Sequence, residues 1–171
     1  NTLLADIHKV TQQHVATFSS NLLSSSRPYW QLPKSKYIEL SFAEKVQQTE
    51  SALLKSLKKA RQRFDKVAIL LSGGVDSSLL AALSKDVFEQ CCLITPVFEG
   101  RENPELATAQ AFARMLSIDH ILVNIDAADL EHALKQLLVC NQAPIRNYSA
   151  LVMMRLMAAI PDRYQAVVYG E

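Results

Sequence analysis

The stretch from residue 67 to residue 83 constrains the fold more than any other part of this chain. Residues 67–71 are apolar, residues 72–78 read Ser-Gly-Gly-Val-Asp-Ser-Ser, and residues 79–83 are again apolar. This pattern predicts a buried strand that turns through two glycines directly into a helix. Glycine lets the backbone approach a ligand closely, and the free N–H groups at a helix start favour negative charge. The junction therefore predicts an anion site, and we expect the anion to be a phosphate.

The composition of the loop restricts which kind of phosphate site it forms. A Walker A loop needs a lysine, but the first lysine after the glycines is Lys85, and no G-x-G-x-x-G pattern is present. The loop offers backbone amides, three serine hydroxyls and the carboxylate of Asp76, which would repel a bare polyphosphate. Mg²⁺ takes one or two carboxylates together with phosphate oxygens, so we interpret Asp76 as a metal ligand beside a bound pyrophosphate. Asp76 as a helix cap without any ligand is the structural alternative.

The rest of the chain alternates between apolar runs and amphipathic stretches. We expect strands at 66–71, 91–98, 119–125 and 165–169, and helices at 42–63, 76–88, 103–117, 127–139 and 148–160. Such alternation predicts an α/β fold with a parallel sheet covered by helices on both faces. Ligands of these sheets bind outside the carboxyl ends of the strands, so the loop and the terminal Gly170-Glu171 are expected in one crevice.

At this point the residues resemble a family. The pattern S-G-G-x-D-S is similar to the PP-loop of the N-type ATP pyrophosphatases. Residues 27–30, 143–150 and 167–171 are in turn similar to segments of the synthetase domain of the asparagine synthetase family, which includes β-lactam synthetases and lasso-peptide cyclases. The similarity covers about residues 27–171. It implies an adenine nucleotide alpha hydrolase-like fold, with ATP and Mg²⁺ as cofactors.

The resemblance also implies a reaction and a set of site residues. The reaction is the activation of a carboxylate as its acyl-adenylate with release of pyrophosphate, followed by transfer to an amine, between molecules or within one. Asp76 and Glu171 are the expected catalytic residues; Asp76 binds the metal, and Glu171 positions the amine or handles its proton. The expected nucleotide-binding residues are Leu70, Ser72, Gly73, Gly74, Val75, Asp76, Ser77, Ser78 and Gly170.

Several interpretations stay open beside these. Adenine is expected near Leu70 and residues 95–98, where apolar residues are equally needed for packing. Arg146, Asn147 and Ser149 fall where the family has acceptor-side residues, although helix capping explains them too. A tRNA-modifying PP-loop enzyme and a non-catalytic nucleotide-binding subunit or fragment are the alternative functions.

The first residues differ in character from the rest of the chain. We expect residues 1–26 to be a linker or the end of a preceding domain, with short strands at 3–10 and 14–18 and a loop at 19–26. Residues 27–171 would then be the amino-terminal part of a synthetase domain, inactive alone and completed by further chain. A glutaminase domain is a possible partner, beside the carboxylate and amine substrates.

Composition excludes a few classes and adds little else. The 171 residues are 49% hydrophobic with a net charge of +1, which gives no sign of a nucleic-acid surface. The basic run at 55–63 is expected to be a solvated helix end. Cys91, Cys92 and Cys140 have no C-x-x-C spacing and are expected to be buried or partly buried free thiols. No apolar run is long enough for a membrane span, so we expect a cytoplasmic protein.

Overall fold

The computed structural model describes residues 5–32, 39–100, 103–141 and 147–170. The chain divides into two compact units, Asn1–Leu40 and Ser41–Glu171. Each unit has its own sheet, and the loop singled out above lies in the second.

The first unit is built on an antiparallel hairpin of β1 (His14–Ser19) and β2 (Leu22–Pro28). Ser20 and Asn21 connect the strands, and both have positive φ, as expected for the tightest hairpin turns. The strand expected at 14–18 is confirmed. The loop expected at 19–26 is wrong from residue 22 onward, because backbone pairing with β1 holds this serine-rich segment extended.

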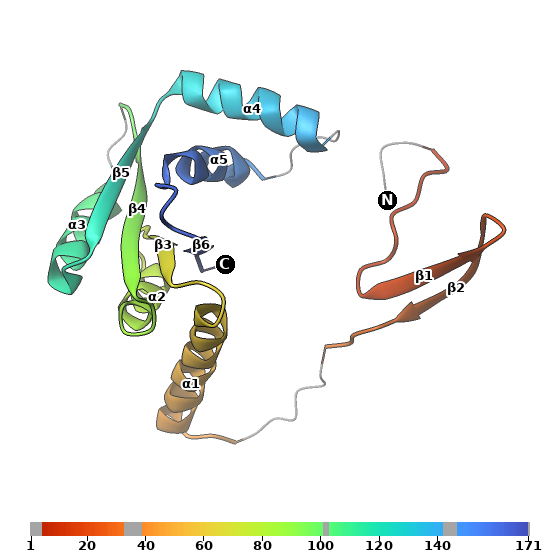
Figure 1. Ribbon diagram of the computed structural model, residues 1–171, viewed down its shortest axis with the longest axis horizontal. Coiled ribbons are helices and arrows are strands. Elements are labelled where there is room, and N and C mark those ends of the chain that lie inside the picture. Colours follow the sequence, from red (N-terminus) through yellow and green to blue (C-terminus); the bar gives the residue numbers. More distant parts are fainter. Residues whose placement is uncertain (1–4, 33–38, 101–102, 142–146, 171) are drawn as a thin grey trace. The chain divides into compact units, whose positions relative to one another are not determined.

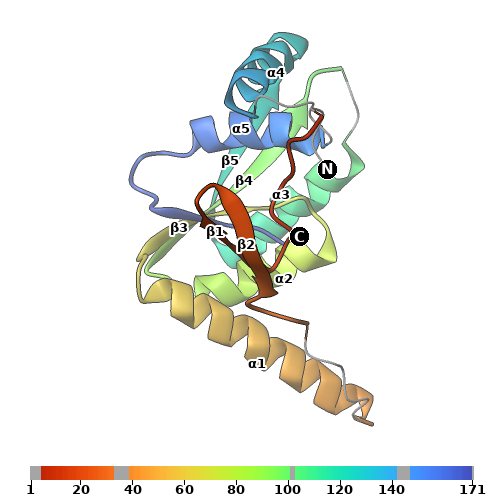
Figure 2. The same cartoon turned by 90° about the vertical axis from the view of Figure 1, so that its right-hand side faces the viewer.

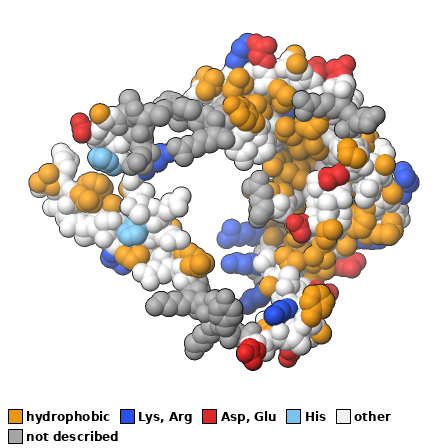
Figure 3. Space-filling view, turned by 180° about the vertical axis from the view of Figure 1, so that it is seen from behind, with side chains coloured by type: hydrophobic (Ala, Val, Ile, Leu, Met, Phe, Trp, Pro, Cys, Tyr) orange, Lys and Arg blue, Asp and Glu red, His pale blue; other side chains and the backbone are white. Residues whose placement is uncertain are grey.

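The hairpin is largely exposed, with only His14 and Ala16 of its two strands partly buried. All of β2 is exposed, and Phe18 and Leu22 are exposed hydrophobic residues. The space-filling view shows hydrophobic side chains at the surface of the molecule (Figure 3). The strand expected at 3–10 is wrong in its described part, since residues 5–10 form a turn followed by irregular chain. Residues 5–10 are all exposed, and a period-2 pattern has little predictive value without a buried face to impose it.

The second unit alternates helices and strands as predicted. Its elements are α1 (Phe42–Arg61), β3 (Lys66–Leu70), α2 (Val75–Lys85), β4 (Gln90–Phe98), α3 (Pro104–Leu116), β5 (Asp119–Ile125), α4 (Ala127–Asn141), α5 (Ser149–Ala159) and β6 (Ala166–Val168). Its four strands pair in parallel in the order β5-β4-β3-β6, which confirms the predicted α/β fold with a parallel sheet. Helix α2 ends three residues earlier than expected, because the N–H groups of Val87 and Phe88 turn back to the Ser84 carbonyl.

Helices cover both faces of this sheet (Figures 1 and 2). On one face, Val67, Ile69 and Leu93 pack against residues of α1, α2 and α3 such as Leu57 and Ala81. The opposite face presents a second set from β4 and β5, which packs against Leu156 of α5: Ile94, Val123 and Ile125. Successive strand residues point to opposite faces, so continuous apolar runs such as residues 67–71 supply both layers at once.

The order of the strands creates a switch point between β3 and β6. From β3 the chain steps outward through β4 to β5, and it then returns through α4 and α5 to add β6 on the other side of β3. Ile69 pairs with Val168, so the carboxyl ends of β3 and β6 lie side by side. A crevice outside these ends is where sheets of this type bind ligands.

Candidate functional site

The loop after β3 leads into a helix that starts without a side-chain cap. Gly74 is the N-cap of α2, and no side chain makes a capping hydrogen bond there. The first helical hydrogen bond runs from the Ser78 N–H to the Gly74 carbonyl at 3.1 Å. Within the described residues, no acceptor is bonded to the N–H groups of Val75, Asp76 and Ser77. These three donors and the positive end of the helix dipole are available to an anion.

Two serines fix the shape of this loop from within. The Ser77 hydroxyl donates to the Gly74 carbonyl at 3.1 Å and accepts from the Ser72 N–H at 3.2 Å. The two hydroxyls lie 3.0 Å apart, and Ser72 Oγ accepts from the Gly74 N–H at 3.2 Å. Because the Ser77 proton is directed at Gly74, Ser72 is the donor between the two hydroxyls. Ser72 and Ser77 thus hold the loop together, and the predicted contacts of Ser72, Ser77 and Ser78 with a nucleotide stay predictions.

Gly73 is required by its surroundings. Its φ of +93° lies in the region that favours glycine, and a Cβ atom there would lie only 2.5 Å from the Glu105 carbonyl oxygen. The loop therefore packs closely against the first turn of α3, which contains Glu105. Sequence reasoning missed this role of Glu105. The signal was the Asn103-Pro104 helix start, which follows the carboxyl end of the neighbouring strand.

Asp76 and the end of β6 meet at the switch point. Asp76 is exposed in the first turn of α2. A Cβ atom on Gly170 would lie 3.9 Å from the Asp76 Cβ and 3.1 Å from a methyl carbon of Leu80. The structure therefore brings together two predicted site residues that are far apart in the sequence. Glu171 lies outside the described residues, and its role stays a prediction.

Two of the predicted acceptor-side residues bond to each other. Arg146 lies outside the described residues. The side-chain oxygen of Asn147 accepts from the Ser149 N–H at 3.0 Å and from the Ser149 hydroxyl at 2.7 Å. These are local bonds at the start of α5, whose N-cap is Tyr148 without a side-chain cap. The acceptor-side role of Asn147 and Ser149 stays a prediction.

The residues expected near adenine point to opposite faces of the sheet. Leu70 and Phe98 both pack against the cluster on the α5 side. Thr95, in contrast, is buried and bonds to Leu71 and His120 on the α3 side, so it is not free to line a base pocket. Val75, another predicted contact, is 83% exposed next to the loop.

The number of carboxylates near the loop fits a metal ion that binds together with a nucleotide. Among the residues that the structure describes, no group of three or more His, Cys, Asp or Glu side chains is arranged to hold a metal ion. Mg²⁺ bound with a nucleotide takes most of its ligands from phosphates and water and needs only one or two carboxylates. Asp76 alone in the first turn of α2 fits that requirement.

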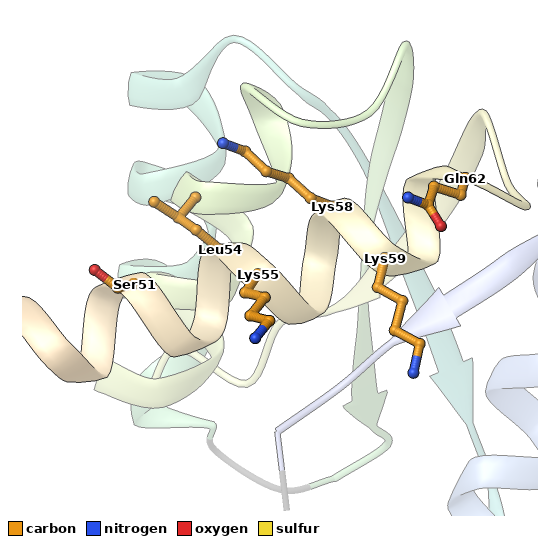
Figure 4. A pocket seen from close by; sticks show the side chains of 6 residues that line it. All are labelled: Ser51, Leu54, Lys55, Lys58, Lys59 and Gln62. Atoms are coloured by element: carbon orange, nitrogen blue, oxygen red, sulfur yellow. The ribbon is translucent and has the colours of Figure 1, made fainter.

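The basic run on α1 is a solvated helix face. Lys55, Lys58 and Lys59 line a pocket of about 620 Å³ together with Ser51, Leu54 and Gln62 (Figure 4). Lys55 and Lys59 point to one side of the helix and Lys58 to the other, so the three ammonium groups do not converge. Their place near the carboxyl end of α1 is the one that the helix dipole favours.

The three cysteines are free thiols, as predicted. Cys92 is buried and Cys91 partly buried, and burial raises the pKa of the Cys91 thiol to about 11. Cys140 is exposed on α4, so the expectation of burial is wrong for that residue. In the described part of the chain, no helix combines the length and apolar character needed to cross a bilayer.

The doubly wound parallel sheet, with a lysine-free glycine loop after its first strand, defines the class: a PP-loop protein of the adenine nucleotide alpha hydrolase-like fold. The structure of NMN synthetase from Francisella tularensis has this fold, with a TM-score of 0.51 and 20% identity over 71% of this chain and 52% of that one. The profile of the asparagine synthase family matches residues 48–171. The chain belongs to that family, a group of ATP-using PP-loop enzymes.

Two curated relatives align with nearly the whole chain. Amidase chyE of Penicillium rubens is 25% identical and amidase chry2 of Gibberella zeae 24% identical, each over 99% of this chain. The chain spans 28% of the length of these relatives.

Proposed function

We propose that this protein is part of an ATP-dependent, amide-forming ligase that activates a carboxylate as its acyl-adenylate. The observation that carries the proposal is the open start of α2. Three N–H groups without partners among the described residues, the exposed carboxylate of Asp76 and the strand end at Gly170 meet at the switch point of the sheet. These groups would suit phosphates together with a carboxylate-bound cation, whereas a Walker-type site would need a lysine.

The chemistry divides into two displacements. A carboxylate oxygen of the substrate attacks the α-phosphorus of ATP, and the bond to the bridging oxygen of the β-phosphate breaks to release pyrophosphate. An amine then attacks the acyl carbon and displaces AMP, while the extra proton on its nitrogen passes to a base, for which we propose Glu171. Mg²⁺, when bound, would offset the charge of the phosphate oxygens.

The residues of the loop act by position and charge. The N–H groups of Val75, Asp76 and Ser77 would bind the β- and γ-phosphates, and Asp76 would hold the cation. Gly170 would let the nucleotide approach the strand end. The described loop contains no group that donates or removes a proton in the first step, so the rate enhancement there would come from orientation and electrostatic stabilisation.

The named activity of two relatives supports an amide as the functional group. Both are called amidases, and the proposed reaction forms the same bond that the name refers to. The proposal covers three sources of the amine: a separate molecule, the same substrate in a ring closure, or ammonia from a glutaminase partner. Hydrolysis of an amide would proceed without ATP, so a requirement for ATP distinguishes the proposed amide formation from amide hydrolysis.

Exchange of labelled pyrophosphate into ATP, in the presence of carboxylate candidates, tests the proposal. The polypeptide that contains this chain should catalyse exchange, and Asp76→Ala should reduce it by about 100-fold or more. Asp86→Ala is the matched control, because Asp86 is an exposed carboxylate at the other end of α2 and should leave exchange unchanged.

Each other outcome has a defined meaning. Normal exchange by Asp76→Ala would refute the metal role of Asp76. ATP binding without exchange would favour a non-catalytic nucleotide-binding subunit. Exchange that requires tRNA would favour a tRNA-modifying enzyme, and amide cleavage without ATP would overturn the ligase proposal.

A further inference from the structure

The carbonyl of Leu71 loses its backbone partner where the chain leaves the sheet. Leu70 pairs with Ile94, and the Leu71 N–H donates to the Ile94 carbonyl at 2.9 Å. In a parallel ladder, the next bond would run from the N–H of residue 96 to the Leu71 carbonyl. Residue 96 is proline, which has no N–H. The ladder between β3 and β4 therefore ends one bond before the phosphate loop begins.

A side chain supplies the missing donor. The Thr95 hydroxyl lies 2.5 Å from the Leu71 carbonyl oxygen, and both residues are only 1% exposed. A buried carbonyl without a donor is destabilising, since water cannot replace the lost bond. Thr95 thus does with its side chain what residue 96 would otherwise do with its backbone.

His120 holds the Thr95 hydroxyl in this orientation. Its Nε2 lies 2.8 Å from Thr95 Oγ1. The threonine hydroxyl has one proton, and that proton is directed at Leu71, so Nε2 must be the donor to Thr95. Nε2 carries a hydrogen in this tautomer and in the protonated ring alike. The chain of bonds from His120 through Thr95 to Leu71 therefore does not depend on the charge of the imidazole.

We propose that Thr95, held by His120, is a positioning residue for the phosphate loop. Leu71 directly precedes Ser72, whose N–H and hydroxyl bond to Ser77. A shift of the Leu71 carbonyl would therefore move the serine bonds that place the first turn of α2. Neither Thr95 nor His120 needs to touch the nucleotide. The inference rests on the proposed nucleotide site, because only a bound phosphate makes the position of the loop matter.

Four variants of the full chain isolate this role. Thr95→Val keeps the shape and removes the donor, whereas Thr95→Ser keeps the donor. The double variant Thr95→Val, Pro96→Ala returns a backbone N–H to the position that the ladder geometry assigns to it. Val123→Ala is the control for general destabilisation, because Val123 is a core residue on the opposite face of the sheet.

Two measurements are made on each variant. The first is hydrogen exchange of residues 72–78 without nucleotide, and the second is the Kd for ATP with magnesium, both at temperatures where the protein is folded. Thr95→Val should exchange at least about fivefold faster in the loop and bind ATP about tenfold more weakly. Thr95→Ser should stay within about twofold of the parent, and the double variant should recover most of the loss.

The outcomes separate the inference from the proposed function. If Thr95→Val lowers the midpoint of unfolding as Val123→Ala does, but leaves loop exchange and the ATP Kd unchanged, the positioning role is overturned. Failure of the double variant to recover either property would overturn the inference that the Thr95 hydroxyl replaces the backbone N–H that Pro96 lacks. If the parent itself binds no ATP while the loop exchange follows the expected order, the positioning role stands and the nucleotide site fails.

Discussion

Helices α1 and α2 begin in opposite ways. At the start of α1, Ser41 Oγ accepts from the Glu44 N–H at 3.3 Å, and the Glu44 carboxylate accepts from the Ser41 N–H at 2.8 Å. This capping box satisfies the N–H groups of Glu44 and Ser41. At the start of α2, Gly74 has no side chain, and the donors remain open. The capped start of α1 contributes to the stability of the fold. The uncapped start of α2, which lies beside a strand end, leaves its N–H donors available to a ligand.

The strongest test of this contrast disturbs the close packing of the loop before α2 against Glu105. Gly73→Ala should lower the free energy of unfolding by about 3 kcal/mol, because the new methyl group would add a clash with the Glu105 carbonyl to an unfavourable φ. Gly100→Ala is the control: φ is +69° there, but no heavy atom lies within 4 Å of the added Cβ. It should cost about 1 kcal/mol. If urea unfolding gave the same loss of unfolding free energy for both variants, the close packing of Gly73 against Glu105 would be contradicted.

A second variant closes α2 in the manner of α1. Gly74→Asp would offer a carboxylate to the free N–H groups and place negative charge beside the phosphates. ATP affinity should fall by about tenfold, equivalent to about 1.4 kcal/mol. Gly74→Ala, measured in the same equilibrium binding assay, introduces the Cβ contact with Ser72 Oγ at 3.3 Å without the charge. The proposed anion site would be in error if the aspartate variant bound ATP as well as the alanine variant.

The third variant opens α1. Ser41→Ala removes the hydroxyl that accepts from the Glu44 N–H and donates to the Glu44 carboxylate, and it should lower the free energy of unfolding by about 1 kcal/mol. Binding of ATP should not change, because the start of α1 has no role in the proposed site. Chemical unfolding and ATP titration of the same preparation check both statements. A loss of ATP affinity would show that the contrast between the two helix starts is false.

The smallest effect is a dependence of stability on pH. Burial lowers the pKa of His120 below 6.5, so the unfolded chain takes up a proton near pH 6.5 that the folded protein resists. The contribution of His120 is therefore complete above pH 6.5 and is lost as the pH falls through the folded-state pKa. The hydrogen bond from the Ser41 hydroxyl lowers the pKa of Glu44 below 4.5, so its contribution is lost only in stronger acid.

Unfolding midpoints measured from about pH 8 to about pH 3 separate the two groups. His120→Gln should flatten the upper part of the profile, and Ser41→Ala should flatten the acid part. A profile that His120→Gln leaves unchanged would contradict the assignment of the upper part to this ring.

Much of the second unit was accessible from the sequence, because its elements have a local cause. The Ser41 and Glu44 spacing predicts the start of α1, and the apolar runs between turn residues predict β3 to β6 within two residues at each end. The glycine pair predicts the turn that leads into α2. Residues 22–26 were mistaken for loop, because an exposed hairpin strand is held by backbone pairing and needs no apolar pattern.

The parts of the site that escaped prediction depend on register. Thr95 is one polar residue in an apolar strand, and nothing local shows that it faces Leu71 beside a proline that cannot donate. Glu105 matters through its carbonyl, which every residue type has. His120 reaches Thr95 from the next strand along the sheet. Such contacts follow from the pairing of strands, and only the assembled sheet reveals them.

The pairing of β6 with β3 also has a consequence for the order of folding. The Asp65 N–H bonds to the side chain of Gln165 across 100 positions in the sequence, whereas the Thr95 hydroxyl reaches Leu71 across only 24. Closing the longer loop costs more chain entropy before any contact compensates for it. We therefore expect β3, β4 and β5 to assemble first and β6 to join late, so that the crevice exists only in molecules that have completed the sheet.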